Sequence, residues 1–339
     1  MKRVTIKDVA REAGVSAAAV SRVFTKRAST SSKTQEKVVA AANRLGYRPS
    51  MVARGLVGDR TNLVTLVSGR MVDPFDALFL YLLSETLADR GIRLLLASTG
   101  TSKAGDSGLL QALDYLSDAV IVSSGNMSLD HSEACVRAGL PIILVGRVVE
   151  LAGVDCVVAD NGDGSRQAAE LLLRTGCRRL AYLGRGGTTF SDKERFDGFS
   201  AAASGDGVSC TLHSVEGPDE KSIFEAAMAM QSAPTRPDGV FCGSDSIAFG
   251  VIEAARALGL DVPGDLSVVG FNNIPQADWR SFRLTTIDYS IPHTIDTVMD
   301  LLDRRLAEPD RASEVRRIPT RLVPRATTRE LPPGAYRCP

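Results

Sequence analysis

The N-terminal residues whose types suit chemical recognition are small side chains, hydroxyl groups and one arginine. Ala17, Ala18, Ser21 and Arg22 fall on the exposed side of a predicted short helix, and Ser16 is expected to cap it. Small side chains allow a helix to approach a DNA groove closely, and an arginine can donate two hydrogen bonds to a guanine edge. This pattern predicts recognition of bases and phosphates, with an ordinary amphipathic helical hairpin as the alternative.

Three helices are expected to position these side chains. The first is predicted to end at Gly14, where the backbone requires a positive φ, and a tight turn leads to the second. The third is expected to begin near Ser32, as its cap, and to end at Gly46. Pro49 disfavours helix at the residue before it. The apolar stripe of the first helix consists of Ile6, Val9, Ala10 and Ala13.

Charge is distributed unevenly along the chain. Residues 1–60 contain 13 lysines and arginines against four acidic residues, whereas the chain as a whole has 40 of each kind. The first 60 residues therefore have a net charge of +9, and the remainder has −9. A basic segment of this kind attracts phosphate, and its binding depends strongly on salt. The charge pattern predicts a DNA-binding head on an acidic body.

Composition places the chain among soluble globular proteins. The 339 residues are 44% hydrophobic and 24% charged, and no apolar run approaches the length of a membrane helix. The start of the chain lacks a signal-peptide core, so we expect a cytoplasmic protein without membrane contact. The cysteines have no paired spacing, which favours reduced, buried thiols over a metal site or a disulfide framework. They stand at positions 135, 156, 177, 210, 242 and 338.

From residue 63 onward, short apolar runs alternate with helical stretches. Strands are predicted at 63–67, 93–97, 119–122, 142–145, 180–183, 239–242 and 266–270. Helices are predicted at 77–90, 132–138, 167–174, 195–203, 247–258 and 294–305. This alternation predicts two doubly wound α/β halves that face each other across a ligand cleft. Crossovers between the halves are expected at 155–160, 288–292 and 322–324.

Residues 5–24, 45–49 and 53–56 together resemble the head and hinge of the LacI (lactose repressor) family of transcription factors. The resemblance implies a recognition helix in the major groove and paired hinge helices in the minor groove, where Leu56 acts as an apolar wedge. Two features depart from the family pattern: Ala17 and Ala18 replace larger polar readers, and Gly55 weakens the hinge helix by roughly 1 kcal/mol relative to alanine. The implied DNA-contacting residues are Thr5, Ser16, Ala17, Ala18, Ser21, Arg22, Ser31, Tyr47, Ser50, Ala53 and Leu56.

The remainder of the chain resembles the effector-binding body of the same family, which is similar to periplasmic sugar-binding proteins. The likeness rests on residues 73–75, 195–199, 241–250, 262–271 and 284–287. It implies that Asp73 and Phe75 line one wall of the cleft, and Arg195, Asp245, Asn272 and Trp279 the other. Carboxylates and a guanidinium suit a small polyhydroxylated ligand, a sugar or a related metabolite.

Each of these residues also has a purely structural interpretation. Asp245 could cap a helix, Arg195 could form a surface ion pair, and Trp279 could belong to the core. Asn272 stands where the family commonly has aspartate, which removes a charge from the site.

The expected fold class is therefore an all-α helix-turn-helix head followed by a periplasmic-binding-protein-like α/β body of two doubly wound subdomains. The expected assembly is a homodimer on double-stranded operator DNA. We assign 1–49 to the head, 50–60 to the hinge, 61–160 and 289–323 to the N-terminal subdomain, 161–288 and 324–331 to the C-terminal subdomain, and 332–339 to a disordered tail.

Two other functions compete with a transcriptional regulator that is controlled by a small effector. A solute-binding protein without a genomic role fits the body but not the basic head. A Rossmann-type enzyme is suggested by Gly184-Arg185-Gly186-Gly187, but this run lacks the Gly-x-Gly-x-x-Gly spacing and is expected to form a flexible cleft loop. The three histidines have no neighbouring partners for catalysis, so we expect no enzymatic activity, cofactor or metal.

Overall fold

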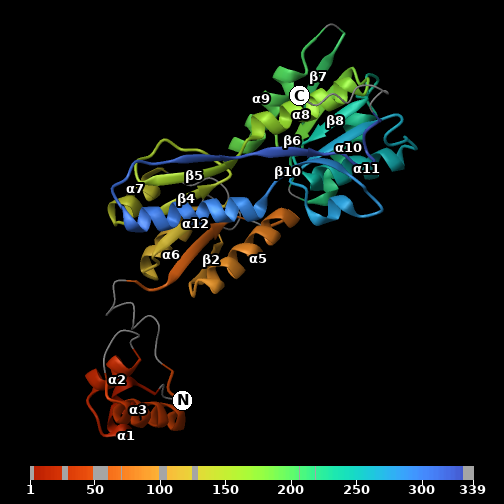
Figure 1. The fold of residues 1–339 in the computed structure, drawn as a ribbon. Helices are drawn as coiled ribbons and strands as arrows, with labels where there is room; N and C mark the ends of the chain where they lie inside the picture. The colour runs from red at the N-terminus through yellow and green to blue at the C-terminus, as the bar shows by residue number, and fades with distance from the viewer. Residues whose placement is uncertain are drawn as a thin grey trace. The chain divides into compact units, whose positions relative to one another are not determined.

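The apolar runs of the body form two six-stranded sheets in a computed structural model of the chain (Figure 1). The structure describes residues 4–24, 30–48, 60–69, 71–98, 105–123, 129–205, 207–217 and 219–330. Two units are distinguished, residues 1–63 with 114–118 and the rest of the chain, and each is described separately. The hinge residues Ser50, Ala53, Gly55 and Leu56 and the expected tail 332–339 lie outside the described residues.

The head is a bundle of three helices, α1 (Ile6–Ala13), α2 (Ala17–Val23) and α3 (Ser32–Leu45). Gly14 has a φ of 64° and ends α1, as its position in the sequence predicts. Ser16 caps α2 by accepting a hydrogen bond of 3.1 Å from the Ala19 amide. The cap of α3 is Ser31 rather than Ser32, because Ser31 Oγ accepts from the Thr34 amide. Val9, Ala10, Val20, Val38, Ala41 and Ala42 form the buried core of the head.

The first sheet belongs to the N-terminal subdomain and has the strand order β11-β5-β4-β3-β1-β2. Its strands are β1 (Leu63–Ser68), β2 (Arg93–Ser98), β3 (Ala119–Val122), β4 (Ile142–Val145), β5 (Val154–Ala159) and β11 (Val315–Ile318). The helices of this subdomain are α5 (Pro74–Asp89), α6 (Gly105–Asp114), α7 (Leu129–Arg137) and α12 (Ile291–Ala307). Helix α5 begins at Pro74, three residues before the expected start, because proline fits the first turn of a helix, where no amide donor is needed.

The second sheet belongs to the C-terminal subdomain and has the order β12-β10-β9-β8-β6-β7. Its strands are β6 (Arg179–Gly184), β7 (Ser209–Ser214), β8 (Gly239–Cys242), β9 (Ser267–Phe271), β10 (Thr285–Tyr289) and β12 (Thr320–Val323). Its helices are α8 (Asn161–Arg174), α9 (Phe190–Ala202), α10 (Glu220–Gln231), α11 (Asp245–Ala257) and the 3₁₀ turn η1 (Pro275–Asp278). Strand β12 pairs antiparallel with β10, whereas β10 pairs parallel with β9 on its other side.

The crossovers between the subdomains are shorter than expected. Residues 154–159 form a buried strand rather than a connection, so the first crossover is reduced to Asp160. The second is Ser290, between β10 and α12. The third is Pro319, because β12 already belongs to the second sheet, and the expected crossover at 322–324 is therefore wrong. Figure 1 shows this C-terminal segment, in dark blue, running from one subdomain into the other.

A buried ionic cluster explains why residues 155–159 form a strand rather than the predicted crossover. Asp155 is fully buried in β5, where a carboxylate would be costly without partners. Arg305 binds it through Nε and Nη2 at 3.1 and 3.0 Å, and Arg311 contacts it at 2.7 Å. The Glu314 amide adds a fourth hydrogen bond of 2.8 Å. These partners lie about 150 positions away in the sequence. The residues next to Asp155 in the sequence therefore predict a loop.

Candidate effector pocket and DNA-binding helix

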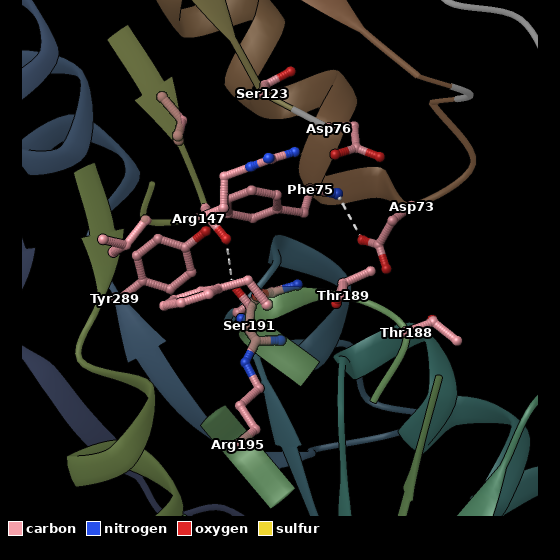
Figure 2. A pocket seen from close by; sticks show the side chains of 15 residues that line it. Asp73, Phe75, Asp76, Ser123, Arg147, Thr188, Thr189, Ser191, Arg195 and Tyr289 are labelled. Atoms are coloured by element: carbon pink, nitrogen blue, oxygen red, sulfur yellow. Dashed lines mark hydrogen bonds between the residues drawn. The ribbon is translucent and has the colours of Figure 1, made fainter. Parts of the chain in front are cut away.

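A cavity of about 500 Å³ lies between the two subdomains of the body. The start of α5 and the segments at the ends of β3 and β4 supply one wall, and α9 with its preceding loop and the ends of β9 and β10 supply the other (Figure 2). Ligand sites in open α/β sheets lie at these carboxyl ends of parallel strands. The lining residues are Asp73, Phe75, Asp76, Ser123, Val145, Gly146, Arg147, Val148, Thr188, Thr189, Phe190, Ser191, Arg195, Asn272 and Tyr289.

Four of the six residues expected to bind the effector line this cavity: Asp73, Phe75, Arg195 and Asn272. Asp73 caps α5 and accepts a hydrogen bond of 2.9 Å from the Phe75 amide. Phe75 packs against Tyr289 with ring centroids 5.4 Å apart. The structure thus combines a carboxylate and an aromatic surface on the N-terminal wall.

Arg195 is held in place by three different interactions. Its Nε donates to Asn161 Oδ1 at 2.8 Å, and its Nη1 donates to the Gly243 carbonyl at 2.5 Å. Its guanidinium carbon lies 3.6 Å from the centroid of the Phe271 ring, within cation–π distance. The surface ion pair considered for this residue is therefore not what holds it. A guanidinium fixed in this way presents its remaining donors to the cavity at little entropic cost.

Asp245 and Trp279 do not line the cavity, contrary to expectation. Asp245 is fully buried and accepts hydrogen bonds from Thr286 Oγ1 at 2.5 Å and from the Ile274 amide at 2.8 Å. Burial raises the pKa of its carboxyl to about 7. It is not a helix cap either, since Ser244 caps α11. Trp279 follows η1 with 56% of its surface exposed, so it does not belong to the core.

Several lining residues were not among the expected site residues, because no motif in the sequence marks them. Asp76 is one of them, and burial together with the nearby charge of Asp73 raises the pKa of its carboxyl to about 7. Arg147 follows β4, and desolvation lowers the pKa of its guanidinium. Thr188, Thr189 and Ser191 come from the loop after β6 and the start of α9. Their position after parallel strands is the one general indication that could have identified them.

Asp192 fixes the loop of Gly184-Arg185-Gly186-Gly187, which the sequence predicts to be flexible. Its Oδ1 accepts from the Tyr182 hydroxyl at 2.7 Å and from the Arg185 amide at 3.0 Å. Its Oδ2 accepts from the Gly187 amide at 2.6 Å. Gly186 and Gly187 have φ values of 65° and 70°, which glycine adopts without strain. The loop is therefore tied to the buried end of β6.

Two polar contacts connect the subdomains, and the first joins two residues that line the cavity. Ser191 Oγ on α9 donates to the Gly146 carbonyl after β4 at 2.7 Å (Figure 2). Glu194 on α9 pairs with both terminal nitrogens of Arg317 on β11, at 2.7 and 3.2 Å. Glu194 also accepts from Asn161, which in turn holds Arg195. Through this network, a change in the relative position of the two subdomains would affect the residues that line the cavity.

In the head, the expected DNA-contacting residues fall into exposed and packed groups. Ser16, Ala18, Arg22 and Ser31 are exposed, whereas Ala17 and Tyr47 pack partly against the core of the head. Thr5 is exposed, and both its amide and its hydroxyl donate to Asp8 Oδ2, at 3.0 and 2.7 Å. Arg22 Nε makes a long contact of 3.4 Å with the Ala18 carbonyl. The exposed side of α2 therefore carries small residues and one cation.

The five described cysteines are free thiols, and four of them are buried. Cys210 is only partly buried, because β7 is the edge strand of its sheet. No group of three or more potential metal ligands is found in the described part of the chain. No helix of the described residues is long and apolar enough to cross a membrane.

Comparisons with known proteins agree with both parts of this arrangement. Residues 5–50 match the sequence model of bacterial regulatory proteins of the lacI family, and residues 169–328 match a periplasmic binding protein-like domain. The chain is 30% identical to the HTH-type transcriptional regulator DegA of Bacillus subtilis, over 84% of this chain and 86% of DegA. It is also 30% identical to the ribose operon repressor of Halalkalibacterium halodurans, over 96% and 97% of the two chains.

Among solved structures, the transcriptional regulator CelR in complex with cellobiose is 26% identical and superposes with a TM-score of 0.70, over 96% of this chain and all of that one. A three-helix head, a two-subdomain α/β body and relatives that match this chain over most of their length lead to one conclusion. The chain belongs to the LacI family of bacterial transcriptional regulators.

Proposed function

We propose that the inter-subdomain cavity binds a small polyhydroxylated effector, a sugar or a related metabolite, and that its occupancy controls DNA binding. The observation that carries this proposal is that both subdomains line one cavity of about 500 Å³. Its wall combines aromatic rings, which suit the apolar face of a sugar, with carboxylates and guanidinium groups, which suit hydroxyls. The names of the ribose operon repressor and of the CelR–cellobiose complex point to the same ligand class.

The head is proposed to bind one half-site of a pseudo-palindromic operator, and two copies of the chain to bind the whole site. In this arrangement Arg22 reads a guanine edge, and Ser16 and Ser31 contact phosphates. Repression is the expected outcome, and the cytoplasm is the expected compartment. A protein of this class requires neither catalysis nor a cofactor.

A face of the N-terminal subdomain is proposed as the contact between two copies. Strand β2 is the edge strand of the first sheet, and Leu96 on it is 46% exposed. Tyr81 on α5 and Leu110 on α6 are also large and exposed. Edge strands and apolar patches of this kind are usually covered in solution. Tyr81→Asp should therefore convert a dimer into monomers in analytical ultracentrifugation, whereas an unchanged mass would place the interface elsewhere.

Effector binding is proposed to act through the contacts that join the subdomains. A ligand that touches both walls binds better when the subdomains are close together, and it therefore shifts their relative position. The coupling between effector and operator is expected to be about 1–3 kcal/mol, a change of roughly 5- to 150-fold in operator affinity.

The proposal is tested with a panel of pentoses, hexoses and disaccharides, including ribose and cellobiose. We expect at least one sugar to raise the melting temperature of the full chain and to change its affinity for operator DNA. Arg147→Gln should remove both effects, because Arg147 lines the cavity. Arg137→Gln is the matched control, since Arg137 is an exposed residue of the same subdomain that pairs with Glu133. A sugar that acts equally on both variants would place the effector site elsewhere.

A further inference from the structure

A second cavity, of about 300 Å³, lies in the body beside the effector pocket. Asp73 lines both cavities, and Val72 and Asp73 are the contribution of the N-terminal subdomain to the second one. The other lining residues come from α10, α11 and the loops next to them. The second cavity is therefore also formed by both subdomains, but it faces different helices from those at the effector pocket.

The interior of this cavity is aromatic. Phe249 and Phe282 stack with ring centroids 4.2 Å apart and an interplanar angle of 26°. Both rings line the cavity together with the buried side chain of Ile223. Gly250 lies beside them, and a Cβ there would come within 2.3 Å of Ile223 Cγ2. An apolar floor of this kind suits a flat or aliphatic ligand body.

One polar atom in this cavity has no partner. Ser246 Oγ is inaccessible to solvent and makes no hydrogen bond among the described residues. A buried hydroxyl without a partner costs free energy, unless a bound molecule supplies the missing hydrogen bond. Ser246 lines the cavity, but its Oγ would reach a ligand there only after rotation of the side chain.

The charge around the cavity is predominantly negative. Asp73, Glu220 and Glu253 line it, against the single cation Arg185. The Nη1 of Arg185 donates to the neutral Gly217 carbonyl, which holds the guanidinium in place and leaves its positive charge. Glu253 is neutralised by Arg256 at 2.6 Å. Asp73 and Glu220 form no ion pair with any basic residue in the described part of the chain. Asp73 and Glu220 therefore outnumber the one cation of the lining, Arg185, and the cavity still attracts a cation.

We propose that this second cavity binds a small organic cation with an apolar body, of the primary-amine class. The stacked rings of Phe249 and Phe282 contact the apolar body, and the ammonium group faces Glu220 and Asp73. Aromatic faces add to the attraction for the cation. Such a ligand differs in charge from the neutral polyol proposed for the effector pocket, so the two sites are chemically distinct.

The test is isothermal titration of the full chain with 2-phenylethylamine hydrochloride, and with 2-phenylethanol as its neutral counterpart. We expect the amine to bind, and the alcohol to bind about tenfold more weakly, because it lacks the charge. No detectable binding of the amine up to about 10 mM, or equal binding of amine and alcohol, would overturn the proposal.

Variants locate the binding. Glu220→Gln should weaken amine binding by about threefold or more, whereas Glu225→Gln should leave it unchanged. Glu225 is a matched control, because it lies on the same helix and is exposed, and it pairs with Lys221 at 3.7 Å. Arg147→Gln should also leave amine binding unchanged, since Arg147 lines only the effector pocket. Equal effects of the two glutamate variants, or loss of amine binding in Arg147→Gln, would contradict the assignment.

Discussion

Arg22 and Arg44 carry the same charge on two helices of the head, but their surroundings differ. Arg44 on α3 pairs with Glu12 on α1 at 3.3 Å, whereas Arg22 is exposed on the face of α2 that carries Ala18. Arg22→Ala should lower the preference for operator over random DNA by about 1–3 kcal/mol and leave non-specific binding in place. Arg44→Ala should weaken both kinds of DNA binding only slightly and to the same extent. Competition binding with operator and random DNA makes the measurement, and an unchanged preference in Arg22→Ala would exclude base reading by this residue.

Asp245 makes the free energy of unfolding of the body depend on pH. Its pKa is raised from 3.8 to about 7 by burial, so between about pH 4 and 7 the folded protein binds a proton that the unfolded chain releases. The free energy of unfolding therefore falls as the pH rises through this range. Asp245→Asn removes this contribution, and the decrease between about pH 5 and 8 should become smaller by about 2–3 kcal/mol.

Urea unfolding of the wild type and of Asp245→Asn, at about pH 5 and at about pH 8, measures this difference. The wild-type decrease should persist in part in Asp245→Asn, because Asp76 also has a pKa raised to about 7. Asp197→Asn is the matched control, since Asp197 is exposed and pairs with Lys193. An Asp245→Asn variant with the full wild-type decrease would show that its carboxyl does not titrate in this range.

At the scale of the element, helix α9 carries three residues at the effector site, and its position depends on close packing against α8. A Cβ on Gly198 would lie 2.9 Å from Gly162 Cα and 3.0 Å from the Gly162 carbonyl oxygen. These are backbone atoms, so the two helices must move apart to admit a methyl group. Gly198→Ala should lower the free energy of unfolding by about 1–3 kcal/mol and weaken effector binding.

Gly162→Ala provides the control on the partner helix. The nearest atom to a Cβ at this position is Asp160 Oδ1, at 4.0 Å. This variant should therefore be as stable as the wild type, or more stable by up to about 1 kcal/mol, because alanine favours helix over glycine. Equal destabilisation of the two variants would contradict the close approach of α8 and α9 at Gly198.

The elements that could be predicted from the sequence are those whose burial is visible in a short window. The runs at 119–122, 142–145 and 239–242 are fully buried strands with the expected bounds. Strands β7 and β11 were missed because they lie at sheet edges and have mainly exposed residues, so no apolar run marks them. Helix α10 was also missed.

The same limit applies to the candidate site. Asp73 and Arg195 could be located because they lie in segments that the family shares. Asp245 lies just beyond a strand, where ligands usually bind. Its side chain is nevertheless buried, and Thr286 and the Ile274 amide donate hydrogen bonds to it. Arg329, near the end of the C-terminal subdomain, donates to the carbonyls of Pro263 and Gly264 at 3.3 and 2.9 Å. Such long-range partners cannot be read from a local pattern.

At the scale of the whole molecule, the neighbouring residues Arg316 and Arg317 differ in the ion pairs that they form. Arg317 pairs across the two subdomains, and Arg316 pairs within one. Arg317 pairs with Glu194 of the other subdomain at 2.7 Å, whereas Arg316 pairs with Glu314 of its own at 2.6 Å. Arg317→Gln should weaken binding of the sugar that gives the largest thermal shift by up to about fivefold, because a half-exposed ion pair contributes up to about 1 kcal/mol. Arg316→Gln should bind that sugar like the wild type in isothermal titration. Identical affinities of all three proteins would show that this ion pair does not affect closure.

The whole molecule combines a head proposed to read DNA with a body proposed to sense a small molecule. The measurement that tests it most directly is sequencing of the source-genome DNA fragments retained by the full chain near physiological salt, with Arg22→Ala in parallel. We predict that the wild-type fragments share a pseudo-palindromic site with two half-sites about one helical turn apart, and that Arg22→Ala loses this enrichment. Retention of the same fragments by both proteins, or of fragments without a shared site, would contradict sequence-specific reading by the head.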